Sequence, residues 1–338
     1  MSTVTTPQPD QAMPASGPAS FVDPASLMRL KNLELRARVV VEGFLTGLHR
    51  SPYHGFSVEF SEYRQYTPGD DPRYLDWRLY ARSDRYYIKR FEDETNLRCH
   101  LLLDLSRSMS FTSLSYTKAD YARTLAATLA YFLSIQRDAV GLMTFDETVQ
   151  EFVPARFRHG QLRRLMTALE RETAGTSTDL VQPLERAAER VAKRGMLILI
   201  SDLPTPLAGL ETSLGYLRAR GHEVLVFQIL DPAELDLTFD EPALFLDAET
   251  GREIYIDPAH ARAVYRDRFA AHTAAIETTC ARLGITHRRF MTDEPLEQAL
   301  SEFLRSRTRG KSQIASTKSQ TNSNVQSRMI KTARSGVS

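Results

Sequence analysis

Short hydrophobic runs alternate with amphipathic segments from about residue 97 onwards. The most hydrophobic runs are HLLLD at 100–104, AVGLMTF at 139–145 and MLILI at 196–200, and polar residues bound each of them. Runs of this length between polar residues predict buried strands. Further strands are expected at 148–153, 223–230 and 287–291.

Between these runs, apolar residues recur at the spacing of an amphipathic helix. One helix is expected to begin at the capping box Thr117–Asp120, and the longest covers about 258–283. Strands that alternate with helices of this length are typical of a mainly parallel sheet with helices on both faces. The predicted fold class is therefore α/β, a doubly wound, mainly parallel sheet that occupies residues 97–307.

The chain before residue 97 has a different pattern. Asp23 and Pro24 are a good helix start, and apolar residues then recur at helical spacing, so one helix is expected over 24–48. Residues 51–94 are crowded with Tyr, Arg and Asp and are interrupted by Pro and Gly. This composition predicts short strands and turns. Residues 23–96 are therefore expected to form a helix followed by a small β-rich module.

Both ends of the chain lack the apolar residues that a core requires. Residues 1–22 are rich in Pro, Ser and Thr, and residues 308–338 are rich in Ser, Thr, Lys and Asn, so both are predicted to be disordered tails. The net charge of +1 hides an asymmetry between the ends and the body. Residues 305–338 carry eight Lys or Arg and no acid, which leaves −7 on residues 1–304.

Composition also excludes several classes of protein. Cys99 and Cys280 have neither the density of a disulfide scaffold nor the spacing of a zinc site, and both are predicted to be reduced core residues. No apolar run approaches the roughly 18 residues of a membrane span, and the first residues do not resemble a signal peptide. A cytoplasmic location is expected.

Polar residues with oxygen donors follow the predicted strands. Asp104, Ser106 and Ser108 come directly after one strand, Asp202 follows another, and a Gly-Thr-Ser-Thr stretch that includes Thr176 lies between them. The carboxyl ends of parallel strands meet at one edge of a sheet, where ligands bind. Carboxylate and hydroxyl oxygens suit a hard divalent ion, so Mg²⁺, with Mn²⁺ as an alternative, is the expected cofactor.

This arrangement resembles the metal-ion-dependent adhesion site of von Willebrand factor type A domains. In that family an Asp-x-Ser-x-Ser loop, a later Thr and a later Asp surround one Mg²⁺. The resemblance assigns the metal to Asp104, Ser106, Ser108, Thr176 and Asp202, with Thr178 as the second choice for the threonine. The family has Thr-Asp-Gly where this chain has Ser201-Asp202-Leu203, which leaves the path of that loop open.

A longer stretch resembles the bacterial domain-of-unknown-function 58 family. The matching residues include Pro68–Arg73, Asp76–Arg78, Lys89–Phe91, Asp138–Leu142 and Gly221–Val224. The resemblance implies a von Willebrand A-like domain after a smaller module, working beside AAA+ ATPases of the MoxR type. Many members of that family carry membrane helices, and none is expected in this chain.

Together these features favour a Mg²⁺-dependent protein-interaction module rather than an enzyme. Because its other ligands would be neutral hydroxyls, the ion could accept an acidic side chain of a client protein. The resemblance adds a MoxR-type ATPase as the second partner, in the assembly or maturation of another complex.

Two alternatives remain open. A strand-end Asp104 could be the nucleophile of a metal-assisted phosphatase or phosphotransferase, although Ser106 stands where a second acid would be expected and the chain has no phosphate loop. The Arg and aromatic residues of 63–91 could bind single-stranded nucleic acid. Four acids within that segment and two directly after it, Glu92 and Asp93, stand against its seven bases. An internally paired platform is therefore favoured over nucleic-acid binding.

Overall fold

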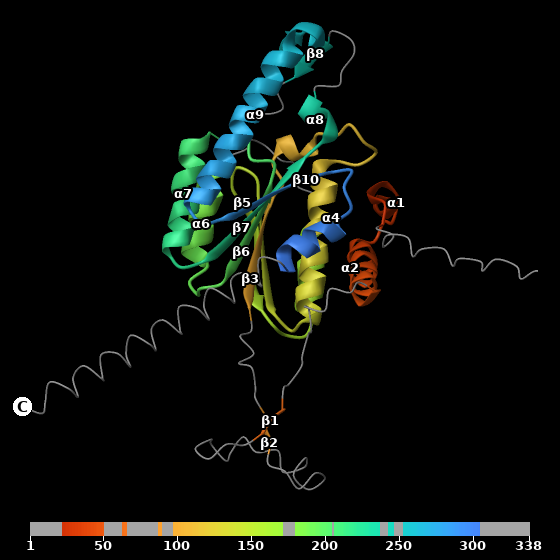
Figure 1. Cartoon of the computed structure of the whole chain (residues 1–338), viewed down its shortest axis with the longest axis vertical. Coiled ribbons are helices and arrows are strands. Elements are labelled where there is room, and N and C mark those ends of the chain that lie inside the picture. Colours follow the sequence, from red (N-terminus) through yellow and green to blue (C-terminus); the bar gives the residue numbers. More distant parts are fainter. Residues whose placement is uncertain are drawn as a thin grey trace, which may run out of the picture.

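The computed structural model describes residues 22–50, 63–65, 87–89, 97–171, 180–204, 206–236, 243–246 and 253–304 (Figure 1). All structural statements below refer to these residues. The predicted ligand Thr176 and its alternative Thr178 fall within 172–179 and lie outside them, as do the two predicted tails apart from residue 22. The domain boundaries drawn from the sequence therefore stay predictions.

A six-stranded sheet forms the centre of the protein, in the order β10-β7-β6-β3-β4-β5. Its strands are β3 (Arg98–Asp104), β4 (Ala139–Phe145), β5 (Val149–Arg156), β6 (Met196–Ser201), β7 (Glu223–Leu230) and β10 (Thr286–Met291). Every neighbouring pair is parallel except β4 and β5. The chain starts this sheet at β3, extends it to one side and then returns to the other side at β6. This order confirms the predicted doubly wound fold class.

Alternate residues of the central strands face two separate hydrophobic cores. Leu101 and Leu103 belong to one core and Leu102 to the other, and β6 and β7 alternate in the same way. The first core contains α2 (Leu33–Arg50), α4 (Lys118–Ile135) and α5 (Gln161–Leu169). The second contains α6 (Val181–Arg190), α7 (Leu207–Ala219) and α9 (Pro258–Arg282). A sheet buried on both faces explains why its strands are apolar throughout.

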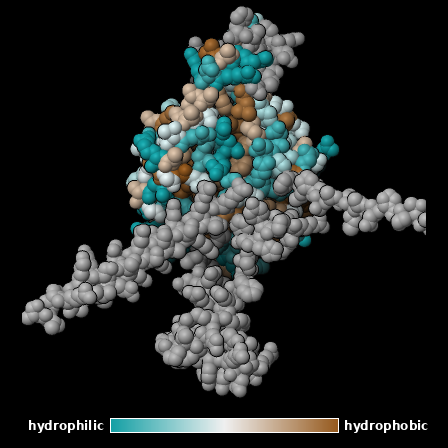
Figure 2. Space-filling view, in the orientation of Figure 1, coloured by the Kyte–Doolittle hydropathy of each residue, from teal (hydrophilic) through white to brown (hydrophobic). Residues whose placement is uncertain are grey.

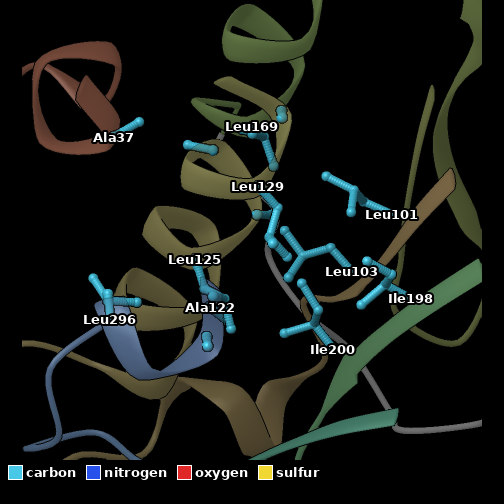
Figure 3. Close-up of a cluster of buried hydrophobic side chains, with 14 of the residues drawn as sticks. Ala37, Leu101, Leu103, Ala122, Leu125, Leu129, Leu169, Ile198, Ile200 and Leu296 are labelled. Carbon is cyan, nitrogen blue, oxygen red and sulfur yellow. The ribbon is translucent and has the colours of Figure 1, made fainter. Parts of the chain in front are cut away.

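Helix α4 supplies the centre of the first core. Leu125 and Leu129 point from this helix toward side chains of β3 and β6 (Figure 3). Leu129 is 0% exposed. Truncation of such a leucine to alanine costs about 2–5 kcal/mol of stability. This packing fixes the start of α4 relative to the end of β3, where the predicted site lies.

Capping side chains set the helix ends. Thr117 and Asp120 form the expected capping box at the start of α4. The single helix predicted over 24–48 is wrong, because the structure has α1 (Pro24–Met28) and then α2. Asn32 interrupts the helix between α1 and α2. Its Oδ1 accepts a hydrogen bond from the Leu35 amide at 2.7 Å, which caps the start of α2.

Several short elements were not expected from the sequence. They are the 3-10 helix η2 (Arg107–Ser110), helix α8 (Pro232–Asp236) and the antiparallel pair β8 (Ala243–Leu246) and β9 (Glu253–Ile256). In the predicted β-rich module, β1 (Tyr63–Gln65) pairs with β2 (Tyr87–Lys89). Helix α9 extends past the carboxyl ends of the sheet strands toward β8 (Figure 1).

The described surface is mostly hydrophilic on the face shown in Figure 2, and hydrophobic residues occur there in small spots. Helices long and apolar enough to cross a membrane are absent from the part of the chain that the structure describes.

Candidate metal centre

The predicted site lies at the carboxyl ends of β3 and β6, where the strand order reverses. Asp104 is the last residue of β3, and Asp202 directly follows β6. The two strands are parallel neighbours with Leu103 opposite Ile200, so they end at the same level of the sheet. The topology therefore brings together two acids that are 98 positions apart in the sequence.

Asp104 is completely buried and is held from both sides. Its Oδ1 accepts a hydrogen bond from the Ser106 amide at 2.9 Å, and its Oδ2 accepts one from the Ser201 hydroxyl at 2.6 Å. Burial, and then the nearby charge of Asp202, raise the pKa of the Asp104 carboxyl to about 7. The ionised form of Asp104 therefore lacks compensating positive charge, and a cation bound beside it would stabilise that form.

The two serines of the loop after β3 connect Asp104 to Asp202. The Ser106 and Ser108 hydroxyls are 3.1 Å apart, and the Ser108 hydroxyl donates a hydrogen bond to Asp202 Oδ1 at 3.2 Å. Four of the five predicted ligands thus form one connected cluster. The fifth, Thr176, lies outside the described residues.

Leu203 stands where the resembling family has glycine, and its backbone conformation shows the path of this loop. Its φ of 59° lies in the left-handed region, which a glycine at this position would adopt without strain. The Leu203 amide donates to the Ser201 hydroxyl at 3.0 Å, and its side chain is 1% exposed within the second core. The loop thus makes a left-handed turn with leucine in place of glycine, and side-chain burial offsets the strain.

Lys118, which the sequence analysis missed, adds a cation to the cluster. Its ammonium donates to Asp202 Oδ2 at 2.7 Å and to Glu234 Oε1 at 2.6 Å, and the side chain is 1% exposed. Burial alone lowers the pKa of Lys118, but the two carboxylates more than offset it, so the pKa is raised. A sequence signal was available: Lys118 is the first residue of α4, where the helix dipole disfavours a positive charge.

Asp231 and Glu234 were also missed. Asp231 follows β7 as Asp202 follows β6, so the rule that identified Asp202 would have identified it. Its carboxylate accepts hydrogen bonds from the Ser113 amide at 2.8 Å and the Ala233 amide at 2.9 Å. Glu234 Oε2 accepts from the Asp231 amide at 2.8 Å. Glu234 therefore caps α8 with one oxygen and holds Lys118 with the other.

Helix α9 is tied to both parts of this cluster. The Tyr265 hydroxyl donates to the Glu234 carbonyl at 2.7 Å, and a ring nitrogen of His272 lies 3.2 Å from the Leu203 carbonyl oxygen. The loop that carries Asp202 and the helix that carries Glu234, α8, therefore have a common support.

The donor set fits a hard divalent ion. Its members are two buried carboxylates and two serine hydroxyls, which are the oxygen donors that Mg²⁺ takes together with water. Within the described ranges, no group of three or more His, Cys, Asp or Glu side chains is placed to hold a metal ion. A site here would therefore depend on the hydroxyl oxygens of Ser106 and Ser108 as well as on the acids.

A separate cavity of about 780 Å³ lies between α9 and β10. Its lining includes Cys280 and His287, and it contains none of the predicted metal ligands. Burial raises the pKa of the Cys280 thiol to about 11, which keeps it protonated and inert. Both cysteines are free and buried, as expected.

Comparison with known proteins gives relatives over most of the chain. The uncharacterized protein Rv1480 of Mycobacterium tuberculosis is 31% identical over 298 residues, which cover 85% of this chain and 92% of that protein. The uncharacterized protein MAV169 of Mycobacterium avium is 34% identical over 163 residues, or 47% of this chain and 95% of that protein.

Solved structures resemble the chain at low sequence identity. A conserved hypothetical protein, BatB, from Bacteroides thetaiotaomicron covers 63% of this chain and 99% of its own, with 14% identity and a TM-score of 0.42. The SpRpn10 VWA domain covers 61% of this chain and 95% of its own, with 10% identity and a TM-score of 0.37. The family described as "Protein of unknown function DUF58" matches residues 62–279, and the chain belongs to this family.

Proposed function

We propose that this protein is a Mg²⁺-dependent protein-interaction module. In this proposal Asp104, Ser106, Ser108 and Asp202 hold the ion, and Thr176 completes the set. The observation that carries the proposal is the hydrogen-bonded cluster at the ends of β3 and β6, in which Asp104 accepts the Ser106 amide and the Ser106 and Ser108 hydroxyls lead on to Asp202. A bound ion would supply an electrophilic position that accepts a carboxylate from a partner.

The burial of Asp104 argues against the phosphatase alternative. A phosphoryl-accepting aspartate needs an open approach for a phosphoryl group, whereas Asp104 is 0% exposed and both its oxygens accept hydrogen bonds from within the protein. A small ion needs only a remaining lone pair on one of these oxygens. Ser106 also occupies the position at which a second acid would act. The cluster is therefore better suited to hold an ion than to attack a phosphoryl group.

The partners in this proposal are a client with an exposed acidic side chain and a MoxR-type AAA+ ATPase. The client follows from the chemistry of the ion, since a hard cation prefers a carboxylate oxygen. The ATPase follows from the family resemblance, and the cytoplasmic location is the one expected from the sequence. Such a module would serve in the assembly or maturation of another protein complex.

The first test is a thermal melt of the purified protein during Mg²⁺ titration, repeated with Mn²⁺. The wild type should melt at a higher temperature as the ion is added, because a ligand that binds only the folded state stabilises it. Asp104→Asn should lose this increase, since it keeps the shape of the side chain but not the charge. Ser110→Ala is the matched control: Ser110 is exposed in the same turn and contacts the Arg107 carbonyl.

The metal site is contradicted if Mg²⁺ raises the melting temperature of the wild type and of Asp104→Asn equally, or does not raise that of the wild type.

The partner is tested by a pull-down from the source cell with both proteins, in Mg²⁺ and in chelator. The proposal expects an ATPase of the MoxR type in the wild-type Mg²⁺ sample alone. Its capture in chelator, or by Asp104→Asn, would show that the interaction does not depend on the ion.

A further inference from the structure

Lys118 is the buried cation of the cluster, and no role in ion binding has been assigned to it. Its ammonium lies 2.7 Å from Asp202 Oδ2, while Asp202 Oδ1 accepts the Ser108 hydroxyl. One carboxylate thus serves the proposed metal loop with one oxygen and a protein cation with the other. A divalent ion at this loop would bind to the negative charge of Asp202, which Lys118 already neutralises in part.

We propose that Lys118 is a positioning residue that competes with the divalent ion for the charge of Asp202 and so weakens ion binding. This inference rests on the proposed function and deepens it. Lys118 belongs to α4 rather than to the loops that carry the ligands, and the capping box and the first core fix the start of that helix. Its charge is therefore held in place and cannot withdraw from Asp202 as a flexible surface lysine would.

Glu234 decides how strongly Lys118 competes. It lies 2.6 Å from the ammonium and is itself fixed, because its other oxygen accepts the Asp231 amide. The more the ammonium is held by Glu234, the less it neutralises Asp202. Lys118 contacts Asp202 and Glu234, and Asp202 in turn lies near Asp104, so three carboxylates stand against one ammonium. The formal charge of these four groups is −2, which a divalent ion would balance.

The competition predicts opposite effects for two substitutions. Lys118→Met removes the competing charge but keeps the length of the side chain, so Mg²⁺ should bind at least tenfold more tightly. Glu234→Gln keeps an oxygen for the Asp231 amide but removes the negative charge that offsets part of the Lys118 charge, so Lys118 neutralises Asp202 more fully and Mg²⁺ should bind more weakly. Substitutions that only damage the fold would weaken binding in both cases.

The experiment measures the Mg²⁺ dissociation constant by titration calorimetry for the wild type and both variants, each checked for folding by circular dichroism. Lys118→Met/Glu234→Gln keeps the formal charge of the cluster at −2 but has no ammonium at Asp202. The proposal expects this double variant to bind more tightly than the wild type. If it binds as the wild type does, net charge rather than competition sets the affinity, and the proposal is wrong.

The results also separate this inference from the proposed function. If the wild type binds Mg²⁺ and Lys118→Met binds it no more tightly, the competition is refuted and the function stands. If only Lys118→Met binds, the competition is upheld and the function fails for the natural protein. Binding in neither refutes both. If Lys118→Met does not fold, Glu234→Gln carries the test, and unchanged or tighter binding by it overturns the competition.

Discussion

The two ends of the central sheet bury polar side chains in opposite ways. At the carboxyl end, Asp104, Asp202 and Lys118 are buried as a cluster of acids with a cation. Near the amino end, His100 and His222 are buried, and burial lowers the pKa of both, to about 4 for His100. One end therefore holds charges beside opposite charges, and the other end keeps these two histidines neutral.

This difference separates function from packing. A neutral histidine such as His100, which stacks with Phe152 and whose Nε2 accepts from the Ala155 amide at 3.4 Å, needs no buried counter-charge. A buried cluster of charges costs several kcal/mol in desolvation, and a hydrophobic replacement of similar volume is often at least as stable. Charges at the end of the sheet where ligands bind are therefore the better candidates for a functional site.

The largest expected effect is the removal of one member of the charged cluster. Asp202→Ala leaves the Lys118 ammonium with Glu234 alone and the Ser108 hydroxyl without this acceptor. Loss of one partner from a buried ion pair costs about 3–5 kcal/mol. We expect a loss of about 3 kcal/mol in the free energy of unfolding, measured by urea denaturation without divalent ions.

The control is an exposed pair of a basic and an acidic side chain. Arg186 and Glu189 are paired at 3.0 Å, and both side chains are 58% exposed. Glu189→Ala should cost less than about 0.5 kcal/mol, because exposed pairs contribute little. Equal losses for Asp202→Ala and Glu189→Ala would show that the buried cluster is not energetically distinct.

A smaller effect is expected at Leu203, in the turn that follows Asp202. Both Leu203→Gly and Leu203→Ala remove the buried side chain, at a cost of about 2–5 kcal/mol. Only glycine also removes the strain of the left-handed conformation, which is about 1–2 kcal/mol. Leu203→Gly should therefore be about 1 kcal/mol more stable than Leu203→Ala, by urea denaturation. A glycine variant less stable than the alanine variant would contradict a strained turn.

The fold could be predicted from the sequence because the hydrophobic runs, the helical periodicity and the capping box all predict the same elements. Every residue of AVGLMTF lies in β4 with the bounds expected, and the capping box at Thr117 starts α4. The break at Asn32 was missed because a hydrophobic repeat continues across it. The β8 and β9 pair was missed because its strands have only four residues each, too few for a clear periodicity.

The site could be predicted only in part. Strand-end acids are visible in a sequence once the strands are known, and Asp104 and Asp202 were found this way. Lys118 could not be placed there, because its contact with Asp202 spans 84 positions and depends on how α4 packs on the sheet. Its position in the first turn of a helix was the one local sign that its charge is compensated from elsewhere.

A further effect, similar in size to the difference between the two Leu203 variants, concerns protons at the amino end. The pKa of His100 is about 4 in the folded protein and near 6.5 in an unfolded chain, so the unfolded state binds more protons between these values. Its contribution to stability is complete above pH 6.5 and is lost as the pH falls toward 4. Between pH 7 and pH 5 the loss attributable to His100 should be about 1–2 kcal/mol.

His100→Gln isolates this contribution, because glutamine does not titrate and its carbonyl oxygen can accept the hydrogen bond of the Ala155 amide. The variant should lose less stability than the wild type between pH 7 and pH 5 in urea denaturation without divalent ions. Added Mg²⁺ at pH 7 should stabilise the variant and the wild type equally, because the proposed ion lies at the other end of the sheet. A change in the Mg²⁺ response would show that the two ends are coupled, and an unchanged pH response would show that His100 is not the neutral buried group assigned to that end.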